Sequence, residues 1–235
     1  MPILLLTRPE PASSQVLSLI RQAVPDVHAI ISPAFEIVTL AAELPLNLMQ
    51  IVLTSATGAA QAARLGVAAG TKAWCVGDKT AAAARSAGFD AVSAGRDAQS
   101  LIEMIRTDPE AESLCHIRGV HSRGDVAQHL TALGKACSEV IAYDQRPCPL
   151  TREAVQALTS QTPVVLPLFS PRTADLIACR PTCPLTIVAM SEAVAEQAAR
   201  LGPQRVVVAQ SPNSADMIAA TCRLLIEQTR GPASL

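Results

Sequence analysis

Five short segments rich in Ser, Thr and Gly have the residue types best suited to binding an anion. Each follows a short apolar run and precedes a stretch rich in Ala or Leu, which predicts a turn from a strand into a helix. These turns are 54–58, 77–80, 170–173, 191–192 and 211–214. Unpaired backbone N–H groups and the helix dipole favour an anion at such a turn. For any one turn, helix capping by Ser or Thr is the simpler explanation, but five turns together favour a polyanion site.

Basic residues accompany these turns and give a second reason to expect an anionic ligand. An Arg guanidinium can form a bidentate pair with a carboxylate or a phosphate. The basic residues near the turns are Arg8, Lys79, Arg118, Arg123, Arg146 and Arg172. For Arg118 and Arg123, the alternative is an ordinary solvated charge in a loop.

Tyr143 is the only Tyr of the chain and lies in an extended segment. Its phenol could donate a proton or a hydrogen bond to a leaving group. The alternative is a Tyr that packs within a linker. Trp74, the only Trp, is expected in the core.

The common catalytic and metal-binding signatures are absent from the sequence. It has no GxGxxG, P-loop, GxSxG or HExxH motif. The histidines lack the spacing of a metal site, and we expect them at the surface or in loops. They are His28, His116, His121 and His129. We therefore expect no metal and no cofactor.

The composition limits the compartment and the partners. A net charge of −1 with 17% charged residues gives no field that would attract nucleic acid or an anionic membrane. The seven cysteines lack zinc or redox spacing, which predicts free thiols in a reducing compartment. No segment resembles a secretory signal or a membrane-spanning helix. We expect a cytoplasmic monomer that binds neither nucleic acid nor membrane.

Short apolar strands alternate with helical stretches along the chain, which predicts an α/β fold with parallel sheets. An internal repeat appears at a shift of 114 positions, which brings 77–92 onto 191–206. Nearly the same shift brings Ser55 onto Ser170, and a slightly shorter one brings Arg8 onto Arg118. The sequence therefore predicts two copies of a doubly wound unit.

Two extended pieces, near 34–38 and 142–147, are not followed by a helix pattern. We expect them to be the crossings between two domains. One domain is then discontinuous, with residues 1–34 and 147–235, and the other is continuous, with residues 37–143. A cleft between the two domains is the expected ligand site.

The ordered motifs resemble those of the uroporphyrinogen-III synthase family over essentially the whole chain. They are TRPEP, LTSATGA, VGDKTAAAARSAGF, the Arg118-Gly119 pair that leads to HLTALG, VIAYDQRP, FSPRTA and AQSPNSADM. The resemblance implies two flavodoxin-like doubly wound parallel-sheet domains joined by a two-stranded linker. It also implies a cofactor-free lyase of heme biosynthesis that acts on hydroxymethylbilane, a linear tetrapyrrole polycarboxylate. Such an enzyme expels the terminal hydroxyl as water, inverts ring D through a spiro intermediate and closes the macrocycle to uroporphyrinogen III.

The resemblance also assigns roles to particular residues. Tyr143 in VIAYDQ matches the family Tyr thought to assist departure of the hydroxyl. Ser55, Ser170 and the turn at Gly77 match family positions that line the cleft. The expected substrate-binding residues are Arg8, Thr54, Ser55, Ala56, Gly77, Lys79, Thr80, Arg118, Gly119, Ser170, Pro171 and Ser191.

The chain departs from the family at 190–193, where the family often has a Gly-Pro-Thr-like turn. The Thr hydroxyl is lost near Ala193, Ser191 could supply a hydroxyl nearby, and Glu192 would repel a carboxylate. Two alternatives to an active synthase stay open. One is a two-lobed anion-binding or sensor module, since fold alone does not assign function. The other is a family member that has lost its activity.

Overall fold

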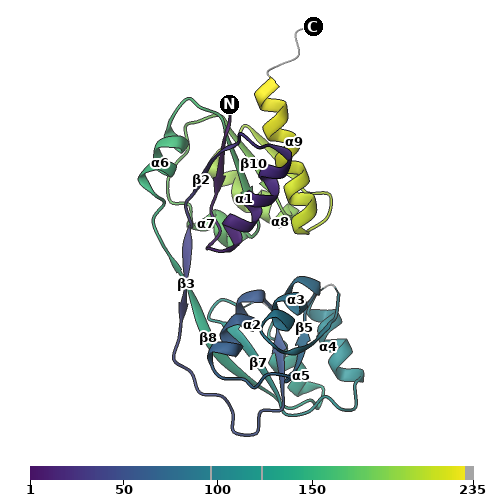
Figure 1. Cartoon of the computed structure of the whole chain (residues 1–235). Helices are drawn as coiled ribbons and strands as arrows, with labels where there is room; N and C mark the ends of the chain where they lie inside the picture. The colour runs from purple at the N-terminus through teal and green to yellow at the C-terminus, as the bar shows by residue number, and fades with distance from the viewer. Residues whose placement is uncertain (96, 123, 231–235) are drawn as a thin grey trace. The chain divides into compact units, whose positions relative to one another are not determined.

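The computed structural model describes residues 1–95, 97–122 and 124–230, which form two compact units (Figure 1). Unit 1 consists of Met1–Glu36 and the described chain from Arg146 onward, and unit 2 consists of Ile37–Gln145. The chain passes from one unit to the other within strand β3 (Phe35–Thr39) and again within strand β8 (Cys137–Pro147). These two strands are neighbours in one sheet.

Unit 1 is built on a five-stranded sheet with the order β11-β10-β9-β1-β2, in which all neighbours are parallel. The strands are β1 (Ile3–Leu6), β2 (His28–Ile31), β9 (Val164–Leu168), β10 (Leu185–Ala189) and β11 (Arg205–Val208). The helices are α1 (Ala12–Ala23), α6 (Arg152–Thr159), α7 (Pro171–Leu176), α8 (Glu192–Ala198), followed by a 3-10 turn (Ala199–Leu201), and α9 (Ser214–Arg230).

Unit 2 is built on a six-stranded sheet with the order β3-β8-β7-β4-β5-β6. Its parallel part runs from β8 to β6. The remaining strands are β4 (Gln50–Leu53), β5 (Lys72–Cys75), β6 (Asp90–Ser93) and β7 (Leu114–Gly119). The helices are α2 (Ala56–Arg64), α3 (Asp78–Ser86), α4 (Ala98–Thr107) and α5 (Val126–Ala132).

Each sheet has a hydrophobic core on both of its faces. Along β1, Ile3 and Leu5 pack with α6, α7 and α8, whereas Leu4 and Leu6 pack with α1 and α9. This alternation follows from the period of two in a strand, and burial on both faces explains why β1 is apolar throughout. Unit 2 repeats the pattern, with α2 and α3 on one face and α4 and α5 on the other.

Trp74 lies in the core between β5 and α4, as expected. It is 2% exposed, and its Nε1 donates a hydrogen bond to Gln50 Oε1 at 2.7 Å. The buried indole N–H therefore has a partner, which removes the cost of desolvating it. No helix within the described ranges is long and apolar enough to cross a membrane.

The internal repeat corresponds to a spatial equivalence of the two sheets. Numbered along the chain, unit 1 has the strand order 2-1-3-4-5, and the five strands β4 to β8 of unit 2, with β3 left out, have the order 3-2-1-4-5. The repeat matches the strands of the two units in pairs, which are β9 with β4, β10 with β5, β11 with β6, β1 with β7 and β2 with β8. With this matching, the two sheets have the same spatial order of strands. Along the chain, these five strands begin with β1 in unit 1 and with β4 in unit 2, and these two strands do not correspond to each other. The reason is that unit 2 is inserted between β2 and β9.

Candidate active site

Several of the candidate site residues lie at the point of each sheet where the strand order reverses. In unit 2 this point is between the adjacent strands β4 and β7, and in unit 1 it is between β1 and β9. Open α/β sheets bind ligands beyond the carboxyl ends of the strands at such a point. Ser55 and Gly119 lie at the ends of β4 and β7, and Arg8 and Ser170 lie just after β1 and β9.

In unit 2 the hydroxyls of Ser55 and Tyr143 are brought together. Ser55 Oγ lies 2.9 Å from Tyr143 Oη. Ser55 Oγ also accepts the backbone N–H of Gly58 at 2.9 Å and so caps α2, whose first residue is Ala56. The cap fixes the Ser55 hydroxyl, and the fixed hydroxyl in turn fixes the position of the phenol.

Gly119 allows the Tyr143 ring to lie directly against the backbone of β7. The register of β7 and β8 shifts between Arg118 and Gly119, so that Gly119 is opposite Tyr143. A Cβ on Gly119 would lie 2.6 Å from Cε2 and 2.8 Å from Cζ of Tyr143. No other residue fits here without displacing the ring or the backbone.

Burial reinforces the protonated, neutral form of the Tyr143 phenol. The residue is 5% exposed and packs in the core cluster on the α2 and α3 face. Burial raises the pKa of the phenol above its usual value, and the hydrogen bond with Ser55 offsets part of this effect. The phenol is therefore protonated at neutral pH and able to donate a proton.

On the opposite face of the sheet, Thr54 begins a second polar network. Thr54 Oγ1 lies 3.1 Å from His116 Nε2, and His116 Nδ1 lies 3.6 Å from Glu139 Oε1. Glu139 Oε2 accepts a hydrogen bond from an Arg118 NH2 group at 2.8 Å, and Arg118 also donates to the Gly119 carbonyl at 3.0 Å. The Arg118 charge is thus compensated within the protein, and its role as a ligand contact stays a prediction.

The expectation that His116 lies at the surface or in a loop was wrong. His116 is fully buried in β7, because this strand is central in the sheet and α4 and α5 cover the face toward which His116 points. The other three histidines are exposed. Burial lowers the pKa of His116 to about 4, although Glu139 acts in the opposite direction. The His in the apolar run LCHI was the one sequence signal for this buried position.

The turn at Gly77 lies after β5, one strand away from the Ser55 turn. Gly77 precedes α3 with an extended backbone and offers no side-chain cap. Lys79 is exposed in the first turn of α3, and Thr80 is 6% exposed. No described contact joins these three residues to Tyr143, so their contribution to one site is still a prediction.

In unit 1 the Ser turns differ in how their hydroxyls are used. Ser170 caps α7 by accepting the backbone N–H of Thr173 at 3.2 Å, and Pro171 is the first residue of that helix. Capping therefore accounts for Ser170, as it does for Ser55. Ser191 precedes α8 without a side-chain cap bond, and the neighbouring Glu192 is exposed.

The Arg8 guanidinium lies over the Phe169 ring, with 4.5 Å from its central carbon to the ring centroid. Of the other basic residues near the turns, Arg146 and Arg172 have partners in the protein, and Arg123 lies outside the described residues. Among the residues that the structure describes, no group of three His, Cys, Asp or Glu side chains could hold a metal ion.

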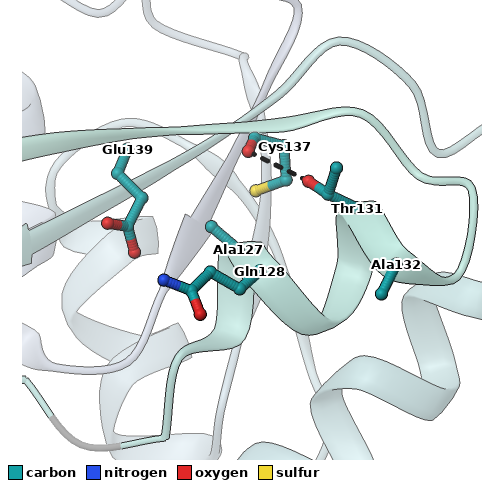
Figure 2. A pocket seen from close by; sticks show the side chains of 6 residues that line it. All are labelled: Ala127, Gln128, Thr131, Ala132, Cys137 and Glu139. Atoms are coloured by element: carbon teal, nitrogen blue, oxygen red, sulfur yellow. Dashed lines mark hydrogen bonds between the residues drawn. The ribbon is translucent and has the colours of Figure 1, made fainter.

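A groove of about 470 Å³ lies in unit 2 between α5 and the first half of β8 (Figure 2). Its lining residues are Ala127, Gln128, Thr131, Ala132, Cys137 and Glu139. Thr131 Oγ1 donates to the Cys137 carbonyl at 3.4 Å, and burial raises the pKa of the Cys137 thiol to about 12. None of the expected substrate-binding residues lines this groove, and its one charged group is a carboxylate.

Two doubly wound parallel sheets with polar turns at the strand ends define the class of protein, and solved structures share this fold. Uroporphyrinogen-III synthetase from Helicobacter pylori 26695 matches with a TM-score of 0.66 at 14% identity, over 95% of this chain and 99% of that chain. A mutant uroporphyrinogen III synthase from the extremely thermophilic bacterium Thermus thermophilus matches with a TM-score of 0.51 at 11% identity, over 96% and 99%. The predicted fold class is confirmed.

The family is shown by the sequence itself. A family model described as uroporphyrinogen-III synthase HemD matches residues 21–219. The chain therefore belongs to the uroporphyrinogen-III synthase family, which confirms the resemblance, and it is an enzyme of tetrapyrrole biosynthesis. A search of curated proteins gave no match.

We predict that the buried His116 makes the protein less stable in mild acid. Its pKa is about 4 in the folded state and about 6.5 when unfolded, so below pH 6.5 the unfolded chain binds the extra proton. The free energy of unfolding should therefore fall by about 2–3 kcal/mol between pH 6.5 and 4.5. Urea unfolding at a series of pH values measures how the free energy of unfolding depends on pH. The contribution of His116 to this dependence should be lost in His116→Gln and kept in the exposed variant His129→Gln. An unchanged slope in His116→Gln would contradict the assignment.

We predict that Gly119→Ala destabilises the protein by about 1–3 kcal/mol, because the added methyl overlaps the Tyr143 ring. Urea unfolding should show this full loss of unfolding free energy when Gly119→Ala is introduced into the wild-type protein. The loss should be much smaller when it is introduced into Tyr143→Leu, where the ring is absent. Equal costs in the two backgrounds would show that the ring contact is not the cause.

Proposed function

We propose that this protein is a cofactor-free, cyclising lyase that converts hydroxymethylbilane into uroporphyrinogen III and water. The match of the uroporphyrinogen-III synthase family model to residues 21–219 is the observation that carries the proposal. The buried, protonated phenol at the reversal point of unit 2 supports it, since loss of the terminal hydroxyl needs a proton donor.

In this proposal Tyr143 donates its proton to the departing hydroxyl. The bond from the terminal carbon to oxygen breaks, water leaves, and the remaining cation is attacked by ring D, which forms the spiro intermediate. The spiro carbon then breaks its bond to the methylene bridge from ring C, and the bridge forms a new bond to the unsubstituted α-carbon of ring D. The proton lost from that carbon returns to the phenolate, so the overall reaction releases only water. Ser55 keeps the phenol oriented and stabilises the phenolate by a hydrogen bond.

The proposed substrate contacts are the polar turns and basic residues at the strand ends. Hydroxymethylbilane can cyclise unaided to the uninverted isomer, so the enzyme must mainly fix its geometry. The proposed contacts are Thr54, Ala56, Gly77, Lys79, Thr80, Arg118 and Gly119 in unit 2, with Arg8, Ser170, Pro171 and Ser191 in unit 1. We propose a monomer that acts in the cytoplasm, which the seven free thiols support.

Isomer analysis of the product tests the reaction. The protein is incubated with hydroxymethylbilane, the products are oxidised, and the type I and type III isomers are separated. The proposal predicts type III product at a rate proportional to enzyme. Type I product alone, at the spontaneous rate, would contradict it and would leave the binding module or the inactive homologue.

We predict that Tyr143→Phe lowers kcat by roughly 100-fold, because it removes the proton donor and keeps the ring. Ser138→Ala is the matched control, since it removes a hydroxyl of the same strand that donates to the Leu114 carbonyl and is not among the proposed substrate contacts. Its kcat should match that of wild type. Urea unfolding of both variants separates a kinetic effect from a folding defect. Wild-type kcat in a folded Tyr143→Phe protein would remove the phenol from the chemistry.

A further inference from the structure

The repeat places Arg8 and Arg118 at corresponding positions, at the ends of the corresponding strands β1 and β7. Their surroundings differ. Arg118 forms an ion pair with Glu139 at 2.8 Å. Arg8 forms no ion pair with any carboxylate of the described chain, and its neighbour is the apolar ring of Phe169. Of these two equivalent cations, only that of Arg118 is neutralised within the described part of the protein.

The Arg8 side chain is held in place without a counter-ion from the described residues. Its guanidinium stacks on Phe169, and the Arg8 carbonyl accepts a hydrogen bond from Ser13 Oγ at 2.7 Å, which fixes the backbone. No described residue accepts a hydrogen bond from the guanidinium N–H donors, which can form a fork for an anion. Burial lowers the pKa of Arg8, so the cation has lost part of its hydration.

A second polar group at the end of β1 also lacks a partner. Thr7 is 1% exposed, and its Oγ1 has no hydrogen-bond partner within the described residues. Buried polar groups are normally satisfied, and a partly desolvated cation without a counter-ion is costly. The end of β1 therefore has unmet hydrogen-bonding capacity at the reversal point of unit 1, where a ligand is expected.

We propose that the Arg8 guanidinium, stacked on Phe169 at the end of β1, binds one carboxylate of the substrate in a bidentate pair. This inference rests on the proposed function, which supplies a polycarboxylate ligand. An anionic carboxylate supplies the missing counter-ion and matches the fork of the guanidinium. The groove between α5 and β8 is a poorer place for it, because no basic side chain among the described residues lines that groove.

Two variants test the subsite, and a third is the control. Arg8→Gln removes the charge, and Phe169→Leu keeps the charge but removes the ring that orients it. Arg21→Gln, at an exposed position in the last turn of α1, removes an equal charge from the same unit. We expect Arg8→Gln to raise KM for hydroxymethylbilane about 10- to 100-fold with little change in kcat, the loss typical of a charge-assisted hydrogen bond. Phe169→Leu should raise KM less, and Arg21→Gln should not change it.

Equilibrium binding of uroporphyrin III, a non-reacting octacarboxylate, gives a readout that does not need turnover. The same weakening by Arg8→Gln is expected, together with a shallower dependence of Kd on salt. Circular dichroism and urea unfolding show whether each variant is folded, and Phe169→Leu provides the test if Arg8→Gln does not fold.

The outcomes separate this inference from the proposed function. If the protein makes no type III isomer but Arg8→Gln still weakens uroporphyrin binding, the subsite stands and the synthase proposal fails. If type III product forms and neither KM nor uroporphyrin binding changes in folded Arg8→Gln, the subsite is overturned and the synthase stands. Equal weakening by Arg21→Gln would show only a general charge effect and would also overturn it.

Discussion

The hydrogen bond between Ser55 and Tyr143 depends on nearly every other feature of unit 2. Ser55 must follow β4 closely and cap α2, and Tyr143 must lie in β8, two strands away from β4 in the sheet. The register shift in β7 and the absence of a side chain at Gly119 let the ring reach that point. A phenol in this position is buried, neutral and fixed in orientation, which are the properties that a proton donor requires.

The two units share the same arrangement of five strands, but their two reversal points differ chemically. In unit 2, Arg118 is paired with Glu139, and the polar group at the strand ends is a phenol. In unit 1 the corresponding Arg8 has no ion pair with a described carboxylate. The proposed function uses both groups, the phenol as a donor of the proton that removes a hydroxyl and the Arg8 cation as a contact for a polyanion.

Much of the fold could be predicted from the sequence, because buried parallel strands are continuous apolar runs and the helices between them are rich in Ala. The residues Ser55, Gly119 and Tyr143 were each predicted, but their mutual contacts were not, because these depend on sheet order and on a shift of register. Arg118 was predicted as well, but its ion pair with Glu139 was not, because that pair joins neighbouring strands of the sheet. His116 was misplaced because the sequence does not show that β7 is central and covered on both faces.

The neutral, buried phenol can be measured directly, because Tyr143 is the only Tyr in the chain. Titration of the folded protein with alkali, followed by the ultraviolet absorbance of tyrosinate, reports this one group. The account predicts a pKa above the usual value of about 10 in the folded protein, a return to about 10 in urea, and a further rise in folded Ser55→Ala. A folded-state pKa at or below 10, unaffected by Ser55→Ala, would contradict it.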